Sequence, residues 1–320
     1  MVMPTKEKTW QYNVNQLTSG SGLALFQTLM LAIKNSLVGF GLYPWLVWGS
    51  SSGAGAFGNN DGVDRWATTG NLIWAGNGSN HSWIVLRQPG LDTNAALCID
   101  LNQLSNPQLA TFVLFPTGVG TNGTATARPS ATDEIQFGNG VNWCGNSAGA
   151  TTRFHVTESN DGQCTRVVLC QSNIATGLWM FDRPKNPVSG WSPAMYGLAR
   201  GVSGTKFPSY AYLNDADYAY GINSSTTFSC YMTSEGWGAA TRGEQITFPD
   251  DDTAEYPVSP VYLASIIGGG RGVAKGSVYY LWWGSTAVAT GDTYPGDGTK
   301  VYAQFGDLIF PWNGSAPLIT

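Results

Sequence analysis

The chain has 320 residues, a net charge of −5, 42% hydrophobic residues and only 12% charged residues. This composition excludes a disordered chain, which would be rich in charge and poor in aromatic residues. The sixteen basic residues are scattered along the sequence, so there is no electrostatic footprint for nucleic-acid binding. We expect residues 1–320 to form a single β-rich domain whose low charge reflects surface covered by other protein.

A helix is predicted from Gly22 to about Val38. Its apolar residues recur at spacings of three and four: Leu23, Phe26, Met30, Ile33 and Leu37. The remaining polar stripe is narrow and consists of Gln27, Thr28, Lys34 and Asn35. A stripe this narrow predicts a helix that is covered on most sides. Ser19 and Ser21 are candidate N-caps, and Gly39 and Gly41 are expected to end the helix.

We do not expect this helix to span a membrane, because it is short for a bilayer and carries Lys34 and Asn35. The charged N-terminal residues are not followed by an apolar signal-peptide core, which predicts synthesis and folding in the cytoplasm.

The run Tyr43–Trp48 is apolar enough to predict a central or well-covered strand. A loop rich in Ser, Gly and Ala is predicted for 49–82. Strands are then predicted at Trp83–Arg87, Ala96–Leu101 and Leu109–Phe115, followed by a long surface loop over 117–134.

The clearest hairpin pairs Arg153–Glu158 with Gln163–Cys170 around the turn signal Asp161-Gly162. One face of this hairpin is expected to be core and carries Phe154, Val156, Val167 and Leu169. The opposite face is expected to be wet or covered by a partner and carries Arg153, His155, Thr157, Cys164 and Arg166.

The second half of the chain shows less periodicity. Leu178–Phe181 predicts a strand that the proline-containing 183–187 ends, and 187–260 is predicted to be a long loop with one β-like patch at Thr226–Met232. Strand-like runs return at Val261–Ile267, Ser277–Trp283 and Val301–Phe310, separated by the glycine-rich 268–272 and by 291–300. We therefore predict a mainly β fold of antiparallel, sandwich-like sheets with one buried N-terminal helix and long Gly- and aromatic-rich loops.

Two glycine motifs share one loop. Gly49–Gly53 matches G-x-S-x-G, and Gly53–Gly58 matches G-x-G-x-x-G. A nucleophile elbow and a dinucleotide site both need a helix directly after the motif, and no helical pattern follows here. We expect neither a serine hydrolase nor a dinucleotide site.

The five cysteines are widely spaced, without a C-x-x-C pair, and are expected to be buried free thiols: Cys98, Cys144, Cys164, Cys170 and Cys230. With the two histidines, His81 and His155, they give no zinc-binding spacing.

The carboxylates cluster at Asp61/Asp64, at Asp215/Asp217 and at Asp250–Asp252 with Glu255. Such loops could serve a glycosidase or hold Ca²⁺, and both alternatives stay open beside simple solvation. Our expectation is that the chain has no catalytic residue, no cofactor and no metal site.

Aromatic residues in the long loop region are the candidate interface residues: Trp191, Tyr210, Tyr212, Tyr218, Tyr220 and Trp237. They suit packing against another subunit, which the low charge favours, or stacking on sugar rings.

Several segments resemble virion structural proteins of tailed bacteriophages, of the tail, baseplate or collar type. In the N-terminal half they are Thr9–Asn15, Asn60–Trp66, His81–Leu86, Ala127–Glu134 and Trp179–Pro184. In the C-terminal half they are Gly243-Glu244, Ser259–Val261, Gly270–Gly272, Leu281–Gly284 and Gly306–Trp312.

The resemblance implies a non-enzymatic virion subunit that assembles with copies of itself, as a trimer or ring, and with other virion proteins. A receptor- or carbohydrate-binding protein at the tail tip, recognising a host-surface glycan, is the alternative.

Overall fold

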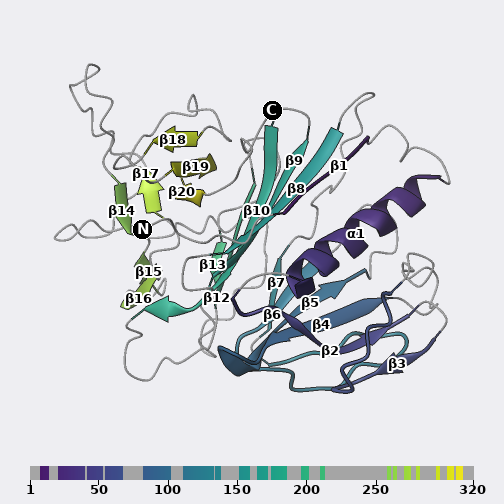
Figure 1. The fold of residues 1–320 in the computed structure, drawn as a ribbon. Helices are drawn as coiled ribbons and strands as arrows, with labels where there is room; N and C mark the ends of the chain where they lie inside the picture. The colour runs from purple at the N-terminus through teal and green to yellow at the C-terminus, as the bar shows by residue number, and fades with distance from the viewer. Residues whose placement is uncertain are drawn as a thin grey trace, which may run out of the picture.

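The computed structural model describes residues 8–13, 21–39, 42–52, 55–67, 82–101, 111–132, 134–137, 151–158, 164–171, 174–185, 196–201, 210–212, 258–260, 262–264, 270–274, 279–281, 293–295, 301–305 and 308–312. This part of the chain is mostly β, with antiparallel sheets and one helix (Figure 1). The prediction of a mainly β fold with an N-terminal helix is therefore confirmed. No helix in these ranges is long and apolar enough to cross a membrane.

Helix α1 spans Ser21–Gly39 and contacts β1 and β8 of the neighbouring sheet. Met30, Ile33 and Leu37 are fully buried, as their spacing predicts. Lys34, which belongs to the predicted polar stripe, is also buried. The reason is a partner thirty residues along the chain, Asp64, which neutralises the ammonium group inside the protein.

One six-stranded sheet has the order β3-β2-β4-β5-β6-β7. Its strands are β2 (Leu46–Ser51), β3 (Phe57–Gly58), β4 (Trp83–Gln88), β5 (Asp92–Asp100), β6 (Thr111–Phe115) and β7 (Ile135–Phe137). β4, β5 and β6 confirm the three strands predicted from the apolar runs.

β2 differs from its prediction at both ends. It begins at Leu46, and it continues through Gly49, Ser50 and Ser51, which were assigned to a loop. Trp45 lies outside the strand because its ring nitrogen donates to Thr165 Oγ1 at 3.1 Å, while its backbone nitrogen donates to the Leu37 carbonyl of α1.

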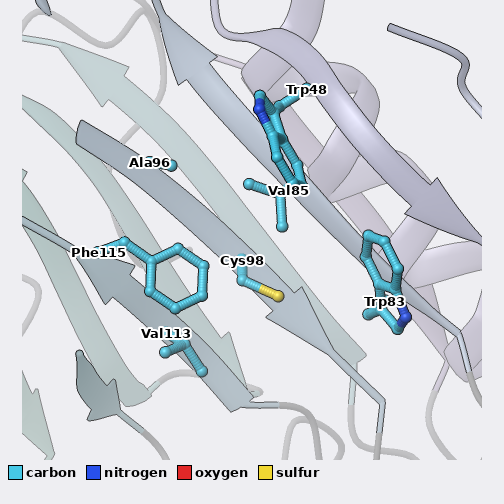
Figure 2. Packing of buried hydrophobic residues seen from close by; sticks show 7 residues of the cluster. All are labelled: Trp48, Trp83, Val85, Ala96, Cys98, Val113 and Phe115. Atoms are coloured by element: carbon cyan, nitrogen blue, oxygen red, sulfur yellow. The ribbon is translucent and has the colours of Figure 1, made fainter. Parts of the chain in front are cut away.

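The core of this sheet is built on one face by alternate residues of four strands (Figure 2). The cluster consists of Trp48, Trp83, Val85, Ala96, Cys98, Val113 and Phe115. Val119 and Ala131 pack against it from the loop over 117–134, so this loop, predicted to lie on the surface, covers part of the core. The opposite face is buried too, at Ile84, Leu86 and Phe112 among others.

The other six-stranded sheet has the order β1-β8-β9-β10-β12-β13. Its strands are β1 (Lys8–Asn13), β8 (Thr151–Glu158), β9 (Thr165–Gln171), β10 (Ile174–Asp182), β12 (Tyr196–Gly201) and β13 (Tyr210–Tyr212). Phe112 of β6 meets Trp179 and Phe181 of β10 edge-to-face, with ring centroids 5.5 Å apart in both pairs.

The predicted hairpin is β8–β9, with Phe154 opposite Leu169 and Val156 opposite Val167. Val156 and Val167 are buried, as expected of the core face. On the other face, however, Cys164 and Arg166 are fully buried within this chain, which corrects the expectation of a wet or partner-covered face at this end of the hairpin.

The C-terminal strands form two smaller sheets. β11 (Pro184–Lys185), β16 (Gly270–Ala274) and β15 (Tyr262–Ala264) make one, in that order. β14 (Val258–Pro260), β17 (Tyr279–Leu281), β20 (Leu308–Trp312), β19 (Val301–Phe305) and β18 (Thr293–Pro295) make the other.

These strands correct four sequence expectations. The segment 187–260 contains β12, β13 and the first strand of the five-stranded sheet, although we predicted a long loop there. Glycine-rich 268–272 overlaps β16, 291–300 contains β18, and the run Val301–Phe310 is divided between two antiparallel strands, β19 and β20. Thr226–Met232 lies outside the described residues.

Candidate functional site

Three of the segments singled out in the sequence meet at the end of β2. These are the loop over 59–66, the start of β4 at Trp83, and the loop over 117–134. We call this region the β3 tip, comprising β3, the loop over 59–66 and the facing loop over 120–127.

The loop over 59–66 folds back directly onto β2. Gly62 N donates to the Trp48 carbonyl at 3.2 Å. Ser50 Oγ donates to the Val63 carbonyl at 2.7 Å and accepts from Arg65 N at 2.9 Å. Gly49 permits this approach, because a Cβ there would lie 2.4 Å from the Gly58 carbonyl oxygen.

Ser51, the central serine of the G-x-S-x-G match, is buried within β2 and makes structural bonds. Its Oγ accepts from Trp83 N at 3.1 Å, and its carbonyl accepts from Trp66 Nε1 at 3.0 Å. The motif therefore anchors two buried tryptophans to one strand.

The two nearby aspartates have separate partners. Arg65 donates to Asp61 through two nitrogens, at 2.6 and 3.2 Å, and this interaction lowers the pKa of Asp61. Asp64 lies 2.5 Å from Lys34 Nζ and accepts from Trp66 N at 2.9 Å. Asp61 thus holds two positions of the loop over 59–66 together, whereas Asp64 holds the loop to α1. The two carboxylates do not form one site.

Asn59 joins the two loops of the β3 tip. Its side-chain nitrogen donates to the Gly123 carbonyl at 2.9 Å, and its side-chain oxygen accepts from Gly123 N at 2.8 Å. Trp83 Nε1 donates to the neighbouring Thr124 carbonyl at 2.8 Å. The loops are therefore held together by paired bonds and are pre-organised as one surface.

The base of the loop over 117–134 is fixed by Arg128. Its guanidinium forms a bidentate ion pair with the Glu134 carboxylate, with N···O distances of 2.7 and 2.9 Å, and lies 3.2 Å from the Asp100 carboxylate. Burial alone would lower the pKa of Arg128, but the hydrogen bond to Glu134 and the surrounding negative charges raise it. Sequence reasoning missed this cluster, although Arg128 and Glu134 both lie in one of the quoted segments.

Cys98 lies beneath this cluster as a fully buried free thiol. Burial, and after it the charge of Asp100, raises the pKa of the Cys98 thiol well above its usual value. Cys164 is likewise a buried thiol outside any disulfide, as predicted, whereas Cys144 and Cys230 lie outside the described residues.

The surface of the β3 tip is nearly free of unpaired charge. Its exposed residues are Phe57, Asn60, Asp61, Gly62, Val63, Gly120, Thr121, Asn122, Thr124, Thr126 and Ala127. Asp61 is the one ionisable residue among them, and Arg65 neutralises it.

The predicted interface aromatics are only partly described. Tyr210 and Tyr212 lie in β13, opposite Ala199 and Gly197 of β12. The other four, Trp191, Tyr218, Tyr220 and Trp237, lie outside the described residues, so the structure does not bring the six together.

Most residues considered for catalysis or metal binding also lie outside the described residues. His155 lies in β8, opposite Thr9 of β1. Residues outside the described part are His81, Asp215, Asp217, Asp250, Asp251, Asp252 and Glu255. Within the described ranges, no group of three or more His, Cys, Asp and Glu side chains is placed to hold a metal ion.

No family model, characterised protein or solved structure matches this chain.

Proposed function

We propose that this chain is a non-enzymatic structural subunit of a tailed-phage virion, in the tail, baseplate or collar, made in the host cytoplasm. The subunit assembles with copies of itself, as a trimer or ring, and with other virion proteins. Within it, the two six-stranded sheets form a β-sandwich with α1 at its side. The contacts of Phe112 with Trp179 and Phe181 support this arrangement.

The observation that carries this proposal is how the charged groups at and next to the β3 tip are used. Lys34, Arg65 and Arg128 each pair with a carboxylate of the same chain. The exposed surface of the β3 tip is rich in Gly, Ala, Thr and Asn, with apolar side chains exposed at Phe57 and Val63. Depletion of unpaired charge is typical of surfaces that become the centre of a protein–protein interface.

The test is the mass of the purified protein in solution, measured by light scattering over a concentration series. A fixed trimer, hexamer or larger closed ring supports the proposal. A monomer at every concentration contradicts self-assembly.

The alternative, recognition of a host-surface glycan, is favoured by one feature of the β3 tip. Asn60, Asn122 and Thr124 are exposed residues of the same tip as Phe57, and polar residues beside an aromatic ring suit a sugar. Binding of the purified protein to a defined glycan array, with loss on Phe57→Ala, would support this alternative over assembly. Retention of the bound glycan in the Phe57→Ala variant would exclude the β3 tip as its site.

A further inference from the structure

We propose that the β3 tip is a contact surface between two copies of this chain, in which β3 of one copy pairs antiparallel with β3 of the other across a two-fold axis. This inference rests on the proposed function and adds a second kind of contact to it: a trimer or ring closes through heterologous contacts, whereas the two-fold contact at the β3 tip joins copies in pairs.

The first argument is the backbone of Phe57. β3 is the last strand of its sheet and pairs with β2. In this pairing Ser50 lies opposite Gly58, and Ser51 lies opposite Phe57. In the same register, Ser52 N donates to the Ala56 carbonyl at 2.8 Å. Hydrogen-bonded and non-hydrogen-bonded pairs alternate along an antiparallel ladder, so Phe57 belongs to a non-hydrogen-bonded pair. Its N–H and C=O therefore point away from β2, toward the edge of the sheet on which no other strand of the described residues lies.

An edge of this kind is a template for another strand. If a second copy approaches across a two-fold axis at Phe57, the two Phe57 residues become a hydrogen-bonded pair that exchanges both N–H···O bonds. The same surface of each subunit is then used twice, which is the property of an isologous contact.

The second argument is charge. The chain carries a net charge of −5, so a contact between copies must avoid placing like charges together. At the β3 tip the exposed Asp61 is paired with Arg65, and Asp64 is paired with Lys34. Two copies can therefore meet here without burying an unpaired carboxylate.

The third argument is exposed apolar area on a rigid support. The side chains of Phe57 and Val63 are 45% and 47% exposed. The Asn59–Gly123 bonds and the ties of Ser50 and Arg65 already order the loops that carry them. Little conformational freedom is left to lose on association, which lowers the cost of forming the interface.

The test uses the full chain with charge placed at Phe57. Because each Phe57 faces Phe57 of the second copy, the Phe57→Asp and Phe57→Lys variants each bring like charges together. We expect each variant alone to halve the mass seen by light scattering, with a dissociation constant raised about tenfold or more. Mixing the two variants in equal amounts should restore the wild-type mass, since Asp then faces Lys.

Leu46→Asp is the matched control. Leu46 is 48% exposed, which is close to the 45% of Phe57. It lies at the start of β2, whereas Phe57 pairs with Ser51 at the end of that strand. It should keep the wild-type mass. Thermal unfolding of every variant checks that the subunit stays folded.

A second variant tests the contact without introducing charge. In Phe57→Cys, mild oxidation should produce a cross-linked dimer on a non-reducing gel, because directly paired strand residues lie within disulfide reach. Wild type treated in the same way is the control for cross-linking through the five native cysteines, of which Cys98 and Cys164 are buried. Only a dimer band that Phe57→Cys forms beyond this control supports the contact.

The outcomes separate the two proposals. A wild-type oligomer that both charged Phe57 variants retain, or that their mixture does not restore, overturns the two-fold contact and leaves assembly standing. A wild-type monomer throughout the concentration series overturns both.

Discussion

Lys34 in α1 and Asp64 after β3 form an ion pair in which the Nζ–Oδ2 distance is 2.5 Å and the two side chains are 2% and 34% exposed. The pair ties the only helix of the described residues to the β3 tip. Its two members are not equivalent, because the ammonium group is enclosed by protein whereas the carboxylate still reaches water.

This asymmetry predicts unequal mutational effects. Asp64→Ala leaves a buried ammonium without its partner, and we expect it to lower the free energy of unfolding by about 3 kcal/mol. Lys34→Met leaves a carboxylate that water can solvate and should cost less. The double variant should be about as stable as Lys34→Met alone, a coupling that urea unfolding at neutral pH measures. Asp64→Asn is the control, since it keeps an acceptor for Trp66 N. Equal effects of the two single variants would contradict this account.

A glycine comparison tests whether the loop over 59–66 must touch β2. In Gly49→Ala the new Cβ would lie 2.4 Å from the Gly58 carbonyl oxygen and 3.1 Å from Asn59 Cα. Backbone atoms cannot rotate away as a side chain can, so we expect a loss of about 1–3 kcal/mol in thermal unfolding. Gly39→Ala, with nothing within 4 Å of its new Cβ, should be neutral or stabilising. A Gly49→Ala variant as stable as Gly39→Ala would show that the loop can lift from the strand.

The sequence predicted the elements whose pattern is local. The spacing of Met30, Ile33 and Leu37 indicates the helix face, and the alternation of Val156 and Val167 indicates the core side of the hairpin. β12 and β16 have no such pattern, because Gly, Ala and Arg interrupt any alternation and the strands depend on hydrogen bonds from neighbours distant in sequence.

The site was harder to predict for the same reason. The sequence shows that Asp61 and Asp64 lie close together, but it cannot show that one pairs with Arg65 and the other with a helix residue thirty positions earlier. Arg166 illustrates the limit most directly. Its place in the hairpin alternation assigns it to the face expected to be wet or covered by a partner, yet it is fully buried within the chain, because burial depends on how the sheets pack. The single domain over 1–320 remains a prediction.

The Cys98 thiol should be unreactive in the folded protein. It is fully buried, and its pKa is raised by burial and by Asp100, so the nucleophilic thiolate is scarce at pH 8. We expect iodoacetamide to leave Cys98 unmodified in native protein and to label it fully in urea, as peptide mass spectrometry would show. Rapid labelling of Cys98 in the native state would contradict the packing of the core cluster.

The Asp61–Arg65 pair predicts an acid-sensitive loop. The hydrogen bond from Arg65 lowers the pKa of Asp61 below the reference value of 3.8, so folding favours the ionised form. A group with a lowered folded-state pKa stabilises the fold above its unfolded pKa, and that contribution is lost as the pH falls through the folded value. The loop over 59–66 should therefore keep its Asp61 tie at neutral pH and lose it only below about pH 3.8. NMR titration of ¹³C-labelled aspartate, with Asp61→Asn for assignment, should give a midpoint below 3.8 that rises toward this value in Arg65→Gln. An Asp61 midpoint that Arg65→Gln leaves unchanged would mean that the ion pair does not set this pKa.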